Sequence, residues 1–159
     1  MPEIARPIAI NAEDAAPRGL PPGFPTDLAA HMATRIKRPL GDPFGLTIFG
    51  VNLTRLPPGA WSVPHHRHKR QDEFIYVLEG TPVLITDAGE TQLSPGMCAG
   101  FPAGGSAHHL ENRGTGDAVI LEVGDRGTGE EVVFPHGDAR ASMQPDGHWN
   151  FTRLDGSPL

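Results

Sequence analysis

The chain has 159 residues and a formal net charge of −6, and its length fits a single domain. The acidic balance argues against a nucleic-acid partner, because a phosphate-binding surface needs a basic patch. No apolar run approaches the roughly 18 residues that a membrane span needs. The N-terminus lacks the basic and apolar regions of a secretory signal. We therefore expect a cytoplasmic protein with no membrane partner.

Glycine and proline punctuate the chain, with 20 and 17 copies respectively, and neither follows a collagen-like period. This composition is typical of many short elements joined by turns. Cys98 is the single cysteine, so a disulfide within the chain is excluded.

The first 26 residues contain six prolines and are expected to form an extended arm that docks late or lies on a partner subunit. Residues 27–38 have the pattern of a helical turn ended by Pro39. From Leu46 onward the pattern changes to short runs with strand character. We expect strands at 46–56, 73–78, 83–86, 91–93, 98–101, 109–112, 118–123, 132–134 and 149–154. Strands at this spacing predict an all-β antiparallel barrel or jelly roll over residues 27–159.

The chain has two clusters of histidines, and the first consists of His65, His66 and His68. Because side chains alternate along a strand, His66 and His68 share one face while His65 takes the other. Two imidazoles on one face, one residue apart, are well placed to share a metal ion.

Glu73 follows five residues after His68, an offset that faces the wrong side in an unbroken strand. The polar segment 69–72 is expected to be a loop or bulge that resets the phase. Glu73 also heads the apolar run 74–78, where burying a carboxylate is costly unless a cation meets it. A metal ion would be such a partner.

His108 and His109 form the second cluster, and only one of them can share the face of the first site. A set of three histidines and one carboxylate suits one divalent ion, Zn²⁺, Fe²⁺, Mn²⁺, Ni²⁺ or Co²⁺, with positions left open for substrate or oxygen.

Two spaced motifs resemble those of the cupin superfamily. Gly59 through Pro64, His66-x-His68, Glu73 and Gly80 resemble the first motif. Gly96, Pro102-x-Gly104, His108 and Asn112 resemble the second. Each motif is one residue longer than usual within a turn, which leaves His65 in place of His66, or His109 in place of His108, as alternative registers. The spacing to Glu73 and Asn112 favours His66 and His108.

The resemblance is to a bacterial group of stand-alone, single-domain cupins. It implies a double-stranded β-helix, or jelly-roll barrel, with a core at about 46–125 behind an N-terminal arm at 1–26. It further implies one divalent metal ion per chain on His66, His68, Glu73 and His108, a small-molecule ligand or substrate, and a homodimer. Asn112 is expected to be a structural amide rather than a ligand.

The function favoured is a metal-dependent enzyme acting on a small organic substrate, as an oxygenase, isomerase or decarboxylase. The alternative is a non-catalytic module that binds a small molecule or metal, and a storage role is less favoured. The sequence leaves the catalytic residues unknown.

Overall fold

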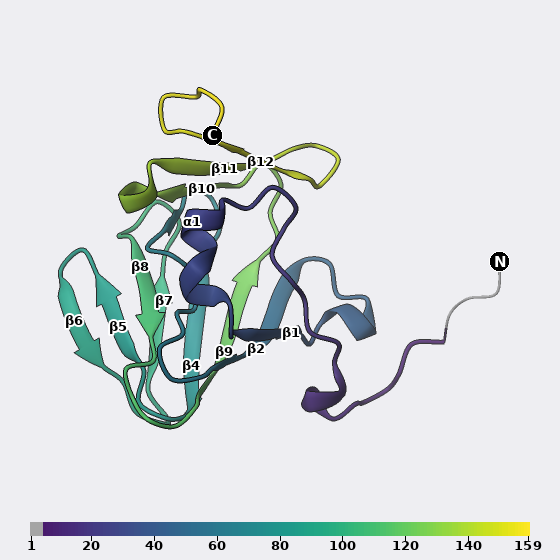
Figure 1. The fold of residues 1–159 in the computed structure, drawn as a ribbon. Coiled ribbons are helices and arrows are strands. Elements are labelled where there is room, and N and C mark those ends of the chain that lie inside the picture. Colours follow the sequence, from purple (N-terminus) through teal and green to yellow (C-terminus); the bar gives the residue numbers. More distant parts are fainter. Residues whose placement is uncertain (1–4) are drawn as a thin grey trace.

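Turn residues divide the chain into short strands, which the structure, a computed structural model, describes over residues 5–159 (Figure 1). In chain order these are β1 (Ile36–Pro39), β2 (Phe49–Leu56), β3 (Arg67–His68), β4 (Glu73–Glu79), β5 (Val83–Thr86), β6 (Gly89–Gln92), β7 (Cys98–Phe101), β8 (His108–Glu111), β9 (Ala118–Asp125), β10 (Glu131–Phe134), β11 (Ala139–Met143) and β12 (Trp149–Thr152).

Three antiparallel sheets make up the barrel. The largest has the order β1-β2-β9-β4-β7, the second β12-β11-β10-β3, and the third β6-β5-β8. Neighbours that are far apart in sequence, such as β2 with β9, produce the crossovers of a jelly roll. The expected all-β jelly-roll fold is confirmed.

Strand β4 lies inside the largest sheet, between β9 and β7, and its residues alternate between the two faces. Ile75 and Val77 are fully buried, whereas Phe74 and Tyr76 are 42% and 38% exposed. Glu73 shares the inner face with Ile75 and Val77, because residues two apart on a strand point the same way. The apolar pattern of β4 therefore directs Glu73 into the barrel and Tyr76 out of it.

Two apolar clusters lie on either side of the barrel interior. The first joins the largest sheet to β5 and β8, through Leu56, Ile75, Leu84, Leu110 and Ile120. The second joins β10–β12 to the N-terminal segment, where Phe24 packs edge-on against Phe134 and Phe151 at ring separations of 6.0 and 5.4 Å. The interior between the two clusters is where the polar side chains gather.

The helical turn expected within the segment 27–38 is present, but it ends at Met32 rather than at Pro39. Its helix α1 (Thr26–Ala29) is short and continues as a 3₁₀ turn to Met32, after which the chain becomes the edge strand β1. Strand β1 forms because Lys37 and Arg38 pair with Thr54 and Leu53 of β2, a contact that local sequence pattern does not reveal.

Gly80 of the first motif ends β4 with a left-handed backbone, at φ +75°. A Cβ there would lie 2.6 Å from the carbonyl oxygen of Asp117, so the turn admits no side chain. Within residues 5–159, none of the helices has the length and apolar character needed to span a membrane.

Candidate metal centre

Three imidazoles converge on one carboxylate oxygen inside the barrel. The Nε2 atoms of His66, His68 and His108 lie 3.4, 3.3 and 2.9 Å from Glu73 Oε2. Ligand atoms of His66, His68 and Glu73 all lie within 4.8 Å of one another, and His108 joins them through Glu73. The four residues expected to bind metal are thus brought together.

Different strands deliver these side chains. His66 and His108 pair across an isolated bridge, with N–H to carbonyl bonds of 3.1 and 2.8 Å in the two directions. His68 ends β3, the chain bends through residues 69–72, and Glu73 begins β4. This bend is the phase change that the sequence predicted. The Phe101 ring stacks on His108, at a centroid separation of 3.4 Å, and fixes the plane of that imidazole.

Burial and mutual contact set the charges of this group. Burial alone would raise the pKa of Glu73, but hydrogen bonds from His108, His66 and His68 hold the pKa of this carboxyl well below its usual range. Burial lowers the pKa of His66 and outweighs the effect of Glu73. Burial also opposes the charged form of His68, but Glu73 and Glu130 together raise its pKa. The centre therefore combines an anionic carboxylate with at least one neutral imidazole.

The far side of each imidazole faces an oxygen that can only accept. His66 Nδ1 lies 3.0 Å from the carbonyl of Pro64, and His108 Nδ1 lies 3.5 Å from that of Ser106. When a metal ion replaces the hydrogen bonds from Nε2 to Glu73, an Nδ1–H group that donates to these oxygens would leave the Nε2 lone pair for the ion. The donor set therefore fits a divalent ion.

Glu130 completes this pattern behind His68. Its carboxylate is almost fully buried, and Oε1 accepts backbone N–H bonds from Lys69, Arg70 and Glu131 at 2.9, 3.2 and 2.7 Å. Oε2 points at His68 Nδ1 from 4.0 Å, and among residues 5–159 neither atom has a hydrogen-bond partner. A carboxylate held in this position can orient a metal-binding imidazole.

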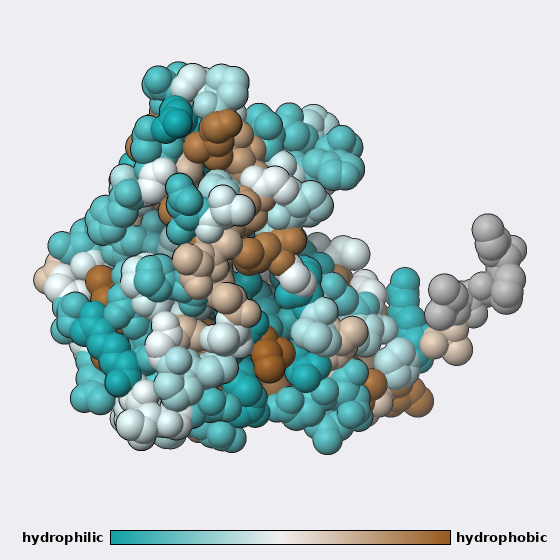
Figure 2. Space-filling model, viewed as in Figure 1, coloured by the Kyte–Doolittle hydropathy of each residue, from teal (hydrophilic) through white to brown (hydrophobic). Residues whose placement is uncertain are grey.

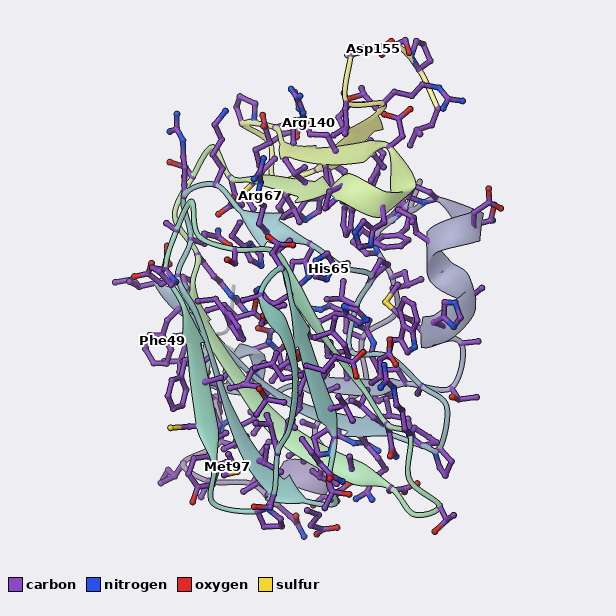
Figure 3. All side chains as sticks on the ribbon, turned by 90° about the vertical axis from the view of Figure 1, so that its left-hand side faces the viewer. Phe49, His65, Arg67, Met97, Arg140 and Asp155 are labelled. Carbon is purple, nitrogen blue, oxygen red and sulfur yellow. The ribbon has the colours of Figure 1, made fainter. Side chains whose placement is uncertain are left out.

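His65 and His109 form a separate cluster. Their Nδ1 atoms lie 3.0 Å apart, while His65 Nε2 contacts Asp87 and His109 Nε2 contacts Glu111, both at 2.9 Å. His65 lies deep in the molecule (Figure 3), yet its ring nitrogens are turned from Glu73 toward these partners. The alternative registers, with His65 or His109 in the centre, are not the arrangement that the structure adopts.

The centre opens into a cavity of about 820 Å³. His66, His68 and Glu73 line it together with residues of β2, β9, the β11–β12 hairpin and the N-terminal segment. Figure 2 shows the surface hollowed between that hairpin and the beginning of β2, with apolar residues gathered down the middle of the same view. This volume is sufficient for a small organic molecule.

Sequence reasoning missed several polar residues of this cavity. Glu122, which is 5% exposed, accepts a 2.6 Å hydrogen bond from Thr54 Oγ1 and pairs with Lys37 Nζ at 2.9 Å. An acidic residue at the inward position of the apolar strand 118–123 was the available signal, as it was for Glu73. Asn112 is an internal brace, as expected: Nδ2 donates to the carbonyls of Leu56 and Gly116, at 2.7 and 2.8 Å.

Comparisons with known proteins agree with this architecture. A family model described as "Cupin domain" matches residues 52–124. A sugar phosphate isomerase of the cupin superfamily from Silicibacter pomeroyi is 41% identical, with a TM-score of 0.88, over 95% of this chain and 96% of that chain. A protein from Acidithiobacillus ferrooxidans, described as a "Putative sugar phosphate isomerase", is 31% identical, with a TM-score of 0.72, over 79% of this chain and 80% of that chain.

A polyketide cyclase from Streptomyces resistomycificus shares the fold at 22% identity, with a TM-score of 0.61, over 75% of this chain and 79% of that chain. A comparison with curated proteins finds no match. Because the family model and a 41% identical relative of equal extent agree with the jelly-roll barrel, the chain belongs to the cupin superfamily.

Proposed function

We propose that this cupin is a divalent-metal-dependent enzyme that isomerises a small organic substrate. One ion per chain, Zn²⁺, Fe²⁺, Mn²⁺, Ni²⁺ or Co²⁺, would be held by His66, His68, Glu73 and His108. The observation that supports this most directly is the convergence of three imidazole Nε2 atoms on Glu73 Oε2, at 3.4, 3.3 and 2.9 Å. Among oxygenase, isomerase and decarboxylase, two relatives described as sugar phosphate isomerases favour the isomerase.

When bound, the ion supplies Lewis-acid polarisation of a substrate carbonyl or hydroxyl oxygen. Isomerisation of a hydroxy-carbonyl compound also needs a group that takes a proton from one carbon and returns it to the next. We assign this role to Glu122, the buried carboxylate of the cavity wall. Thr54 and Lys37 engage its Oε2, and within residues 5–159 no hydrogen bond engages Oε1, which is left for substrate.

Metal analysis tests the site. Protein purified without tag or chelator and reconstituted with each of the five ions is expected to hold one ion per chain. The double variant His66→Ala/His68→Ala should lose the ion and stay folded. His65→Ala is the matched control, since it removes a buried imidazole next to the centre, and it should retain the ion. Occupancy well below one with all five ions, or the opposite pattern in the variants, would refute the ligand set.

Substrate chemistry tests the reaction. An isomerase exchanges substrate hydrogen with solvent deuterium, consumes no oxygen and releases no carbon dioxide. Substrate-dependent oxygen uptake would assign an oxygenase, and carbon dioxide release a decarboxylase. Metal binding without turnover of any sugar phosphate tried would favour the alternative, a non-catalytic binding module. The Glu122→Gln variant should retain the ion and lose the exchange.

We also propose a cytoplasmic homodimer built from a 27–159 barrel and an arm at 1–26. The outer face of the largest sheet exposes Phe49, Phe74, Leu78 and Met97 by 40–43% each, an apolar surface of the kind that interfaces cover. Phe49 and Met97 lie on the same outer side of the molecule (Figure 3). Ile8 of the arm is fully exposed as well, and Figure 1 shows the described start of the arm running away from the barrel.

Sedimentation tests the dimer. The wild-type chain should sediment as a dimer at micromolar concentration, and Phe74→Glu, which places a charge on the outer face, should shift it to monomer with the barrel intact. A dimeric Phe74→Glu variant would exclude this face as the interface. A monomeric wild-type chain at all concentrations would exclude the dimer.

A further inference from the structure

Cationic side chains line one wall of the cavity above the candidate metal centre. Arg18 of the N-terminal segment, Arg35 just before β1 and Lys37 within β1 all contribute to it, together with the single carboxylate of Glu122. Three positive groups against one negative group leave this wall with a net positive charge. These three cations gather on one wall although the formal net charge of the whole chain is −6.

The two arginines of this wall have no acidic partner. Arg18 donates to the amide oxygen of Asn52 at 3.3 Å, and Arg35 donates to the carbonyl of Ser62. Within residues 5–159, no carboxylate lies within ion-pair distance of either guanidinium, whereas Glu122 neutralises Lys37 and Asp42 neutralises Arg126 on the cavity rim.

The remaining rim carboxylates are occupied elsewhere. Asp72 Oδ1 accepts from the backbone N–H of Ala103 at 2.8 Å, and Asp125 Oδ1 accepts from that of Asp72 at 2.7 Å. Both carboxylates keep their charge, but within residues 5–159 neither forms an ion pair with Arg18 or Arg35. Arg35 is largely buried, and burial lowers its pKa, with Arg18 acting in the same direction and Glu122 against it. Burying a cation in this way is costly unless an anion meets it.

We propose that Arg18 and Arg35, assisted by Lys37, bind the phosphate group of the substrate. The proposal rests on the proposed function, since it names the substrate class of the same cavity: a small molecule that carries a phosphate monoester. The two guanidinium forks match the double charge of that group, and the ammonium of Lys37, already paired with Glu122, adds a donor for its three peripheral oxygens, whereas a carboxylate offers two oxygens and one charge.

The N-terminal segment takes a direct part in this subsite. The backbone N–H of Arg18 donates to the carbonyl of Lys37 at 2.8 Å, which fixes the segment alongside β1. Residues 19–22 continue along the cavity, and Phe24 then anchors the segment in the second apolar cluster. The segment thus forms part of the wall of its own barrel.

Phosphorus NMR titration with inorganic phosphate tests the subsite in the full chain at pH 8 and low ionic strength. Protein stripped with a chelator is compared with protein as purified, so that binding to the arginines is separated from binding to a metal. Arg18→Ala removes an exposed side chain and should leave the fold intact, which circular dichroism can check. The matched control is Arg126→Ala, which removes a cation of the same cavity that Asp42 already neutralises.

Stripped wild-type protein should bind phosphate, and Arg18→Ala should weaken this binding by about tenfold. Arg126→Ala should change it by less than about twofold. Equal affinity in Arg18→Ala and wild type, loss of binding on stripping, or acetate binding as tightly as phosphate would each overturn the proposal. Metal content of Arg18→Ala should match wild type. A failure of the metal ligand set would appear in the histidine variants and not in this titration.

Discussion

Glu130→Gln probes the contact behind His68 with a change of one atom. An amide at this position can keep Oε1 on the three backbone N–H groups of Lys69, Arg70 and Glu131, but it places an NH₂ group where Oε2 faces His68 Nδ1. A donor there favours the tautomer with hydrogen on Nε2, which removes the lone pair that a metal needs.

The expected loss of metal affinity is about 10- to 100-fold, the usual cost of removing such a partner. This equals about 1.4–2.7 kcal/mol of binding free energy. Because the three backbone bonds exchange a charged acceptor for a neutral one, unfolding free energy without metal should fall by about 1–2 kcal/mol. The Glu130–His68 separation of 4.0 Å exceeds a hydrogen bond, so this expected loss requires that the contact shorten when metal binds.

Competition with a chromophoric chelator at pH 7.5 measures the affinity directly. Glu131→Gln, the same substitution one residue along, is the control, because Glu131 pairs with Lys69 and Arg140 rather than with an imidazole. Its metal affinity should equal that of wild type. Equal affinities for Glu130→Gln and wild type would show that Glu130 does not orient His68.

Further substitutions have separable effects. Asn112→Ala removes one buried and two part-buried hydrogen bonds and should lower the free energy of unfolding by about 3 kcal/mol in urea titrations; a loss below about 1 kcal/mol would contradict the bracing role. Ile75→Ala should cost about 2–5 kcal/mol by the same measurement, since Ile75 is fully buried beside Glu73. His65→Ala should cost about 1–3 kcal/mol by breaking the contacts with Asp87 and His109. Metal lost along with that stability would show that the two histidine clusters act as one.

Local sequence signals were sufficient to predict most of the strands. Turn residues bound β2, β4, β5 and β7 near their expected limits, because glycine, proline and aspartate restrict the backbone whatever surrounds them. Strands β1 and β11 were missed. The sequence of β11, Ala139–Met143, has little strand propensity and takes its structure from pairing with β10 and β12 on both sides.

The candidate centre was predictable where spacing carries the information. His66 and His68 share a face because side chains alternate along a strand. The polar segment before Glu73 predicts the bend that brings Glu73 to the same side. The arrangement behind the centre was not predictable, because Glu130 reaches His68 only through the pairing of β3 with β10. His136 likewise gave no signal, yet its ring stacks on His65 at 4.6 Å. Such contacts depend on which distant strands become neighbours.

The convergence of His68, Glu73 and His108 also bears on the stability of the barrel. Strands β3, β4 and β8 belong to three different sheets, so each sheet contributes one of these side chains. An ion bound by these three side chains would link the three sheets, and opening of any one sheet would release it. Such a ligand stabilises the closed barrel by about 2.7 kcal/mol when its concentration is a hundred times Kd. The melting temperature should therefore rise with the concentration of the metal.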